Sequence, residues 1–308
     1  MIHRPSPARV VALLALSIIA GHAPARATPA GFAFLEVPAG ARPSALGGAF
    51  ASRADGAEAT FWNPAGLAAT TRLEIVGSHV EFFQQLRHEQ FAFARPLWGG
   101  GASLGLRAMY SEPITERDEI GNEIGTFGGH DLEFSLAYGR TVARGLRAGG
   151  SFQVVRERIA ESSATTWAVG GGVTWDPLQP LRLSLSAHNL GPAAHYKLDD
   201  GLPGEAVSLP AAVQAGASYG VAVGTGFELR GSLETRLTRG RSAVAMVGGE
   251  LAHITGAAIR VGYRANDDAT NLGFGVGYAF SALRLDYAFV PAQLDLGDTH
   301  RFSFAAAF

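Results

Sequence analysis

The sequence predicts an all-β protein: a transmembrane antiparallel β-barrel of about 14 strands, with a short N-terminal helical plug in its lumen. Three observations predict this fold. Segments of roughly 10 to 15 residues alternate polar and apolar side chains from residue 72 to the C-terminus, which is the period of a strand with two different faces. The connections between these segments alternate in length, and the chain begins with an export signal.

The N-terminus has the pattern of a secretory signal peptide over residues 1–27. Arg4 and Arg9 are basic, residues 10–20 are apolar, and residues 25–27 form an Ala-x-Ala cleavage signal. This order favours export over a buried N-terminal helix and predicts cleavage between Ala27 and Thr28. The apolar run is shorter than the roughly 20 residues that a helix needs to span a bilayer.

The composition excludes several classes of function. The formal net charge is −2, so nothing indicates binding to nucleic acid. The chain has no cysteine, which excludes disulfides and thiolate chemistry. No linker or low-complexity block divides the mature chain, so we expect only a plug over residues 28–71 and a barrel over residues 72–308.

The stretch from Ser44 to Leu67 is rich in small residues and predicts the plug. Asp55 and Glu58 have the spacing of a capping-box variant, with residues 56–62 forming about two helical turns. Asn63 precedes a proline, so it ends that helix and caps a further turn that begins at Pro64.

Strict alternation places the strands, as in residues 181–188, where leucine or alanine alternates with Arg, Ser and His. The predicted strands span residues 72–82, 87–97, 101–112, 130–141, 144–158, 164–176, 180–190, 210–220, 225–238, 242–252, 255–264, 270–280, 281–290 and 299–308. An even number of strands is the rule in bacterial outer-membrane barrels.

Every second connection is a tight turn, at residues 98–100, 143–144, 176–179, 221–224, 254–255 and 280–281. The connections between them tend to be longer, at residues 112–129, 191–209 and 291–298. Short turns at one rim and longer loops at the other are typical of an outer-membrane barrel, and a periplasmic N-terminus would put the tight turns in the periplasm.

The alternative is a secreted β-sandwich or propeller, but one strand face is repeatedly Leu, Phe, Tyr or Val, which suits lipid. A closed barrel also leaves no strand edge unpaired in lipid. We therefore predict the outer membrane of a Gram-negative-type bacterium.

The last strand ends on aromatic residues, Phe304 and Phe308. In a soluble fold they would be core anchors. After a signal peptide and a series of alternating strands, they are better explained as the C-terminal signal that the barrel-assembly machinery reads.

Several short stretches together carry a family resemblance, at residues 40–50, 54–59, 63–67, 188–191, 209–210, 260–263, 285–289 and 299–304. Over essentially the whole mature chain they resemble the PorV/PorQ family. That family is similar to the FadL-type long-chain fatty-acid transporters, which are barrels of the same size with an N-terminal hatch that carries an Asn-Pro-Ala motif. The resemblance implies that the hatch motif comprises Asp55, Asn63, Pro64, Ala65, Gly66 and Leu67. It also implies a role in type IX secretion for some members and none assigned for others.

Seven charged residues alternate with apolar neighbours on the strands: Arg182, Glu228, Arg230, Glu234, Arg236, Arg284 and Asp286. Charges on the lipid face of a barrel are costly, so these side chains should face the lumen. A network of ion pairs that braces the wall and plug is favoured over a role in steering a polar or anionic solute.

Other patterns give weaker hypotheses. The nine histidines include no H-x-x-x-H pair, although His79 and His88 could face each other across the first hairpin. In the loop 191–209, a calcium site would use Asp199, Asp200 and Glu205, which lack the regular ligand spacing. We expect a solvated loop there, and no metal or cofactor.

Two further patterns resemble enzyme or nucleotide sites only superficially. Ser186 and His188 share a strand face, but Asn189 should point the other way, and no nucleophile-elbow motif surrounds the serine. The glycines at 273, 275 and 277 follow a strand period, which favours close approach of the plug over phosphate binding. We therefore expect no catalytic residue and no enzyme activity.

These patterns leave three functions open. The leading hypothesis is a protein-export accessory or surface-anchoring barrel, whose long loops would engage secretion-apparatus or exported proteins. The alternative is a transporter for hydrophobic or small molecules, through a plugged lumen or a lateral opening, with an apolar pocket against Phe61 and Trp62. The third is a structural envelope protein.

Overall fold

The computed structural model describes residues 31–82, 86–197, 203–293 and 297–308. The predicted signal peptide and its cleavage point at Ala27 and Thr28 lie outside the described residues. So do Asp199 and Asp200 of the proposed calcium loop, together with the side chain of Glu205.

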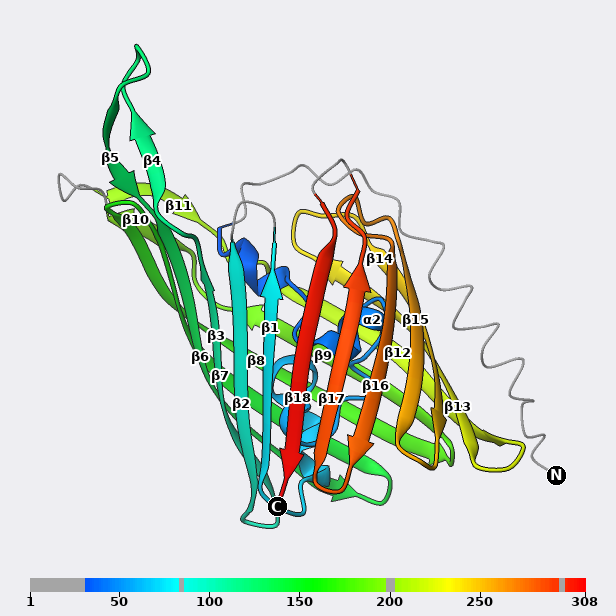
Figure 1. Ribbon diagram of the computed structural model, residues 1–308. Coiled ribbons are helices and arrows are strands. Elements are labelled where there is room, and N and C mark those ends of the chain that lie inside the picture. Colours follow the sequence, from blue (N-terminus) through cyan, green and yellow to red (C-terminus); the bar gives the residue numbers. More distant parts are fainter. Residues whose placement is uncertain (1–30, 83–85, 198–202, 294–296) are drawn as a thin grey trace.

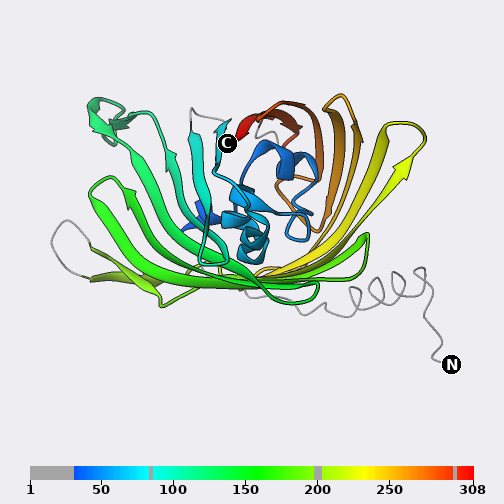
Figure 2. The same ribbon diagram turned by 90° about the horizontal axis from the view of Figure 1, so that it is seen from below.

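The strands form a closed antiparallel barrel of 14 strands, which confirms the predicted fold class. Consecutive barrel strands are neighbours, β8 pairs with β9, and β1 pairs with β18 to complete the ring (Figures 1 and 2). The barrel strands are β1 (Glu74–Glu81), β2 (Arg87–Leu97), β3 (Gly100–Tyr110), β6 (Gly129–Ala143), β7 (Leu146–Ile159), β8 (Ser162–Leu178), β9 (Leu181–Leu190), β12 (Ala212–Val223), β13 (Phe227–Thr238), β14 (Val244–His253), β15 (Ala257–Ala265), β16 (Leu272–Phe280), β17 (Leu283–Val290) and β18 (Thr299–Ala307).

Each predicted strand has its counterpart, with ends that shift by a few residues. The two longest loops contain hairpins that the sequence analysis did not predict. One is β4 (Ile114–Arg117) with β5 (Glu123–Phe127), and the other is β10 (Ala194–Lys197) with β11 (Pro203–Val207). Figure 1 shows the β4–β5 hairpin standing beyond the rest of the molecule.

The alternation of turn lengths is also present, and it defines two rims. The tight-turn rim has connections such as residues 98–99, 144–145 and 281–282, and the C-terminus lies there (Figure 1). The other rim, called here the loop rim, carries both hairpins. One loop-rim connection departs from the pattern, because only residues 160 and 161 join β7 to β8.

The plug consists of five short helical segments inside the ring of strands, which Figure 2 shows in blue. They are η1 (Ala33–Glu36), α2 (Ala41–Ala45), η2 (Gly56–Glu58), α3 (Ala59–Trp62) and η3 (Pro64–Ala69). The described chain begins at the loop rim, where Gly31 packs against Val207. It then descends to the tight-turn rim, where the backbone carbonyl of Leu73 accepts a 2.8 Å hydrogen bond from Phe308. The described start of the plug therefore lies at the loop rim. The sequence analysis had instead placed the N-terminus on the side of the tight turns.

Local sequence explains part of the plug. The predicted turns over residues 56–62 are confirmed as η2 followed by α3. The Asn63 cap is also confirmed, because its Oδ1 accepts a hydrogen bond from the backbone N–H of Ala65 at 3.1 Å, with Pro64 as the first residue of η3. The capping box is wrong: the Asp55 side chain makes no capping bond, since two wall arginines bind it. No helix in the described residues is long and apolar enough to cross a membrane.

Two rows of glycines make room for the plug. Gly101, Gly139, Gly149 and Gly172 are successive cross-strand neighbours on β3, β6, β7 and β8. A Cβ atom on Gly139 would lie 2.1 Å from the backbone oxygen of Pro64, so only glycine lets η3 approach. The second row lies on β14, β15 and β16 and receives residues 44–47 in the same way; it comprises Gly248, Gly262 and Gly273. Close approach to the plug therefore explains Gly273, and also Gly275, where a Cβ atom would lie 2.5 Å from that of Ala45. It does not explain Gly277, where a Cβ atom would meet Asp286 and Arg260 of the wall.

Candidate functional site

Glu250 on β14 binds three arginines, two of which come from the plug. Its carboxylate, which is 2% exposed, accepts hydrogen bonds from Arg42 and Arg53 of the plug and from Arg260 on β15. The Arg42 Nε to Glu250 Oε2 distance is 3.3 Å. Burial of a carboxylate is tolerated only where such partners compensate it. The plug is therefore held to β14 and β15 by ion pairs.

The same network extends to β17 through two of the predicted charged residues. Asp286 accepts from Arg260 and from Arg284, each at 2.8 Å. Glu58 of the plug bonds to Arg284 at 2.8 Å and to Arg42 at 3.2 Å. Glu58 is thus a link to the wall and not the second half of a capping box.

Asp55 forms a second link, near the tight-turn rim. Its two carboxylate oxygens bind Arg147 on β7 at 3.1 Å and Arg182 on β9 at 2.8 Å. Asp176 on β8 also binds both arginines. These four side chains connect the plug to three neighbouring strands.

The loop between α2 and η2 is held by a third carboxylate, that of Glu234 on β13. It accepts hydrogen bonds from the backbone N–H groups of Ala51 at 3.0 Å and Ser52 at 2.8 Å. The side chain of Gln214 donates to it as well, at 2.5 Å. Glu234 is 1% exposed, so these donors replace the water that the charge has lost.

The remaining predicted charges have different surroundings. Glu228 and Arg230 pair with each other at 2.6 Å, and both side chains remain about two-fifths exposed. Arg230 also lies 3.7 Å from the Glu250 carboxylate, at the edge of its network. Arg236 forms no ion pair with any of the described residues and lines a small cavity beside the plug. The sequence analysis missed Arg42, Arg53, Glu250 and Arg260, although the two wall residues show the same strand alternation as the residues it chose.

Residues 63–67, which the resemblance assigns to a hatch motif together with Asp55, lie where η3 meets the wall. Asn63 is fully buried, and its Nδ2 donates to the carbonyl of Val173 on β8 at 3.3 Å. A Cβ atom on Gly66 would lie 1.9 Å from the backbone oxygen of Ala54, so no other residue fits there. Pro64, Ala65 and Leu67 are buried beside them, and Leu67 belongs to the main apolar core of the plug.

An apolar cluster near the loop rim holds the first part of the plug. Phe32, Phe34 and Leu35 are buried there against the inner faces of β7 and β8 and against Leu209. Glu157 on β7 accepts a 2.5 Å hydrogen bond from the backbone N–H of Phe32, and the hydroxyl of Tyr196 on β10 donates to the same carboxylate. The sequence analysis did not single out the side chains that pack together at this end of the lumen.

Two small cavities lie between the plug and the wall. The one beside Phe61, Trp62 and Val76 has a volume of about 30 Å³, and the one beside Arg236 has about 20 Å³. A cavity needs roughly 10–15 Å³ to hold one water molecule. Each of these two cavities therefore holds a few water molecules at most.

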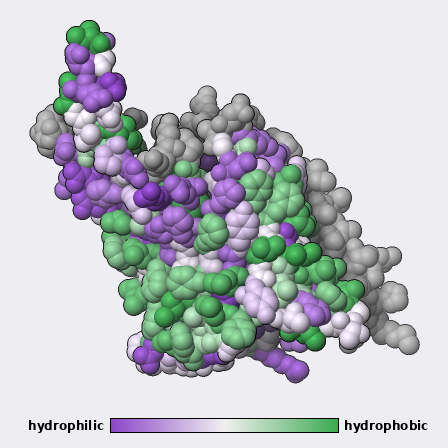
Figure 3. All heavy atoms as spheres, viewed as in Figure 1, coloured by the Kyte–Doolittle hydropathy of each residue, from purple (hydrophilic) through white to green (hydrophobic). Residues whose placement is uncertain are grey.

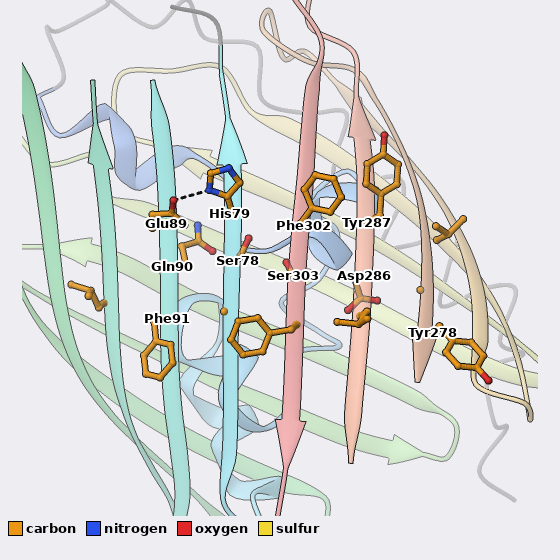
Figure 4. Close-up of a pocket in the computed structure, with 16 residues that line it drawn as sticks. Ser78, His79, Glu89, Gln90, Phe91, Tyr278, Asp286, Tyr287, Phe302 and Ser303 are labelled. Atoms are coloured by element: carbon orange, nitrogen blue, oxygen red, sulfur yellow. Dashed lines mark hydrogen bonds and ion pairs between the residues drawn. The ribbon is translucent and has the colours of Figure 1, made fainter. Parts of the chain in front are cut away.

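A far larger depression lies on the outer face of the barrel, over β1, β18, β17 and their neighbours. This outer hollow has a volume of about 800 Å³ and contains the side chains of Phe91, Tyr278, Tyr287 and Phe302, which Figure 4 labels. His79 and Glu89 form a 2.7 Å ion pair at its edge. On the same face of the molecule, Figure 3 shows apolar side chains over the lower half and polar ones above. The outer hollow is therefore mainly apolar with a polar edge.

The C-terminal aromatic residues lie at this wall. The ring of Phe304 covers Gly77, its cross-strand neighbour, because a Cβ atom on Gly77 would lie 2.4 Å from the ring atom Cε1. Phe308 is 70% exposed at the tight-turn rim.

The structure separates the histidines that the sequence analysis had paired. His79 on β1 pairs with Glu89, its cross-strand partner on β2, on the outer face. His88 precedes Glu89 on β2 and is fully buried, because neighbouring residues of a strand point to opposite faces. Among the described residues, no three His, Asp or Glu side chains gather as metal ligands would.

Ser186 and His188 do share a face, with 2.9 Å between Oγ and Nε2. The expectation that Asn189 points away from them is wrong. Asn189 has a φ of 57°, the β8–β9 pairing shifts register at this point, and its side chain is buried with Nδ2 donating to the carbonyl of Pro210. Asn189 and His188 line the same small cavity beside Arg236.

The fold is shared with several solved structures. The toluene transporter TodX of Pseudomonas putida matches with 11% sequence identity and a TM-score of 0.59, covering 87% of this chain and 98% of that chain. The monoaromatic hydrocarbon channel CymD matches with 13% identity and a TM-score of 0.57, covering 87% and 97%. A FadL homologue of Pseudomonas aeruginosa matches with 13% identity and a TM-score of 0.51, covering 87% and 98%. Identities this low show the fold alone.

These structures agree with the FadL-type part of the resemblance drawn from the sequence, and they do not show membership of PorV/PorQ. They are channels and transporters by name, not enzymes. No curated protein matches the sequence. Residues 8–164, about half of the chain, match a family that is described as uncharacterised. The chain therefore belongs to the uncharacterised protein family UPF0164.

Proposed function

We propose that this protein is an outer-membrane channel that passes small hydrophobic molecules. One observation carries the proposal: an apolar space lies against Phe61 and Trp62 of the plug, where a transporter was expected to have one. The fold shared with hydrocarbon channels supports the same function. The space holds about 30 Å³, so a hydrophobic molecule could occupy it only after the plug or the wall moves.

The proposal includes how the protein reaches the membrane. Residues 1–27 would direct export, and the barrel-assembly machinery would read the last strand with Phe304 and Phe308. The apolar outer face, with Leu104, Phe134 and Leu136 more than half exposed, suits outer-membrane lipid.

Uptake by whole cells tests this function. The protein would be expressed in a Gram-negative strain whose outer membrane excludes an apolar fluorescent dye, and dye uptake would be followed with and without it. Val76→Trp should fill the space beside Phe61 and reduce uptake. Ile75→Trp, on the other face of the same strand, should leave uptake unchanged. Equal uptake by cells with and without the parent protein would refute the function, provided that the barrel migrates differently before and after boiling.

A role in protein export remains a second candidate, because the β4–β5 hairpin stands beyond the barrel. Ile120 at its tip is 84% exposed, and Ile124 is 60% exposed, as a surface that contacts another polypeptide would be. Such a role predicts a partner in secretion that binds through loops 112–129 and 191–209. Retention of a co-purifying exported protein after deletion of both loops would exclude it.

A further inference from the structure

The small cavity beside Arg236 is lined by polar side chains that can donate hydrogen bonds. These side chains come from β3, β7, β9 and β13, and they are Arg107, Gln153, His188, Asn189 and Arg236. The plug forms the other side of the cavity with residues 35 and 37–39 and with Phe61 and Trp62. No aspartate or glutamate is among the described residues that line it. The cavity is therefore a polar site between plug and wall that has donors and no negative charge.

Arg236 carries a charge that the protein does not compensate at this place. It follows Glu234 by two residues on β13, on the face that meets the plug, and it forms no ion pair with the described residues. The Glu36 carboxylate, which attracts it, is already bound to Arg241 at 2.6 Å. A charge inside a barrel that lipid surrounds needs a partner of opposite sign, because an unpaired charge away from bulk water is strongly unfavourable.

The backbone carbonyls of the plug are also occupied on this side. That of Leu35 accepts a 3.1 Å hydrogen bond from Arg107, and that of Ala39 accepts a 3.0 Å bond from the Trp62 ring. The carbonyl of Pro38 accepts from Arg301 on β18 at 3.5 Å. Arg301 is 3% exposed and likewise has no ion pair among the described residues. Two arginines without carboxylate partners thus act on the same segment of the plug.

The other lining side chains can direct donors to one point. Arg107 uses Nε for Glu133 and Nη1 for Leu35, so its Nη2 group remains as a donor. Asn189 gives one amide hydrogen to the carbonyl of Pro210 and has a second. The Oε1 atom of Gln153 is buried without a described partner, and rotation of this amide would present its NH₂ group instead. These donors suit an anion.

The volume of the cavity limits the anion to a single atom. It is about 20 Å³, and one water molecule needs roughly 10–15 Å³. Sulfate, phosphate and the carboxylate of a fatty acid have several heavy atoms and do not fit. A halide ion fits, and chloride is the halide that an outer membrane meets.

We propose that chloride binds in this cavity, between Arg236 and Arg107 of the wall and residues 35–39 of the plug. The ion supplies the negative charge that Arg236 lacks. Movement of these plug residues away from the wall opens the site and releases the ion, so bound chloride opposes that movement. Chloride is thus a structural ligand of the plug, whichever molecules the protein passes.

Hydrogen exchange of the purified protein in detergent tests this site. The amides to follow are those of Leu35 and Val37, which bond to the carbonyls of Phe32 and Phe34. Exchange would be compared in sodium chloride and in sodium gluconate at equal ionic strength, because gluconate is too large for the cavity. An opening that releases the ion slows by a factor of 1 + [L]/Kd, so exchange should slow about tenfold when chloride is at ~10 times its Kd. Equal exchange in the two salts would overturn the proposal.

Two arginine variants locate the effect. Arg236→Gln should remove the difference between chloride and gluconate. Arg230→Gln, on the same face of β13 but paired with Glu228, should keep it. A chloride effect of the parent size in Arg236→Gln, or its loss in both variants, would overturn the site. Slower exchange in sodium octanoate and not in chloride would overturn the assignment of a halide in favour of a carboxylate.

Bromide provides a second measurement that needs no variant. Crystals of the parent soaked in sodium bromide should show an anomalous peak in the cavity, in contact with Arg236 and Arg107. Density for water without an anomalous signal would overturn the proposal. A bromide peak without any effect of chloride on exchange would indicate an adventitious ion only, and would overturn the proposed role in holding the plug.

Discussion

The wall holds the plug through two different kinds of contact, which are clearest in two different regions. Toward β13, β14, β15 and β17, buried carboxylates such as Glu250 bind arginines and backbone N–H groups. Toward β3, β6, β7 and β8, a row of four glycines lets η3 pack directly on the strands. The contacts of Glu250 depend on charge compensation and those of the four-glycine row on close packing. Each side also has some of the other kind, because Gly248, Gly262 and Gly273 receive residues 44–47 and Asp55 binds Arg147 and Arg182. The contacts of Glu250 should therefore be sensitive to the loss of a side chain, and the four-glycine row to the gain of one.

Glu250→Ala gives the largest expected effect. It would leave Arg42, Arg53 and Arg260 buried without their shared partner, a change that costs about 3–5 kcal/mol when one member of a buried pair is removed. We expect the plug to become accessible to protease while the barrel stays assembled. Glu228→Ala, which removes a carboxylate of the partly exposed pair, is the control and should protect the plug as the parent does.

Gly149→Val tests the packed side. A Cβ atom there would lie 2.4 Å from backbone atoms of Pro64, which cannot move aside as a flexible side chain can. Overpacking of this kind costs about 1–3 kcal/mol, so η3 should be displaced and ion conductance through the barrel should appear. Gly150→Val, whose added Cβ would have only a 3.8 Å contact, should not conduct. If Gly149→Val leaves the barrel sealed, the glycine row is not a seat for the plug.

Asn63→Ala should have a smaller effect on the same side. It removes the cap of η3 and the bond to Val173, and loss of an N-cap costs about 1 kcal/mol. We expect faster hydrogen exchange at the amide of Ala65 and no change in barrel assembly. Asn63→Asp keeps the acceptor and should restore most of the protection, whereas equal exchange in all three proteins would contradict the cap.

The smallest expected effect lies outside the barrel, at the tip of the β4–β5 hairpin. Hydrogen bonds from the side chain and backbone of Asn122 lower the pKa of Asp118 below the ordinary value of an aspartate, 3.8. A lowered pKa stabilises the turn above the ordinary Asp pKa, and this contribution is lost as pH falls through the lowered value. Limited proteolysis of the tip should therefore accelerate below pH ~4 in the parent. Asp118→Asn should show less pH dependence, and the same acceleration in that variant would exclude Asp118 as the cause.

The sequence by itself determined the wall and part of the plug. Period-two alternation located all of the barrel strands, because the two faces of each strand meet different surroundings wherever it lies in the ring. The short helical turns before Asn63, and its cap on η3, were also predictable, because they depend on residues only a few positions apart. The same local reasoning failed at Asp55, where Arg147 and Arg182 are brought in from distant strands.

Only the tertiary structure decided which residues meet. Glu250 was not singled out, since its partners Arg42 and Arg53 lie in the plug, about two hundred positions away in the chain. The glycine rows become visible only when the register aligns residues from four strands. The pairing of β1 with β18 likewise brings Gly77 and Phe304 together from opposite ends of the barrel sequence. Alternation fixes the face of each residue, but cross-strand neighbours depend on register and closure, which are properties of the whole ring.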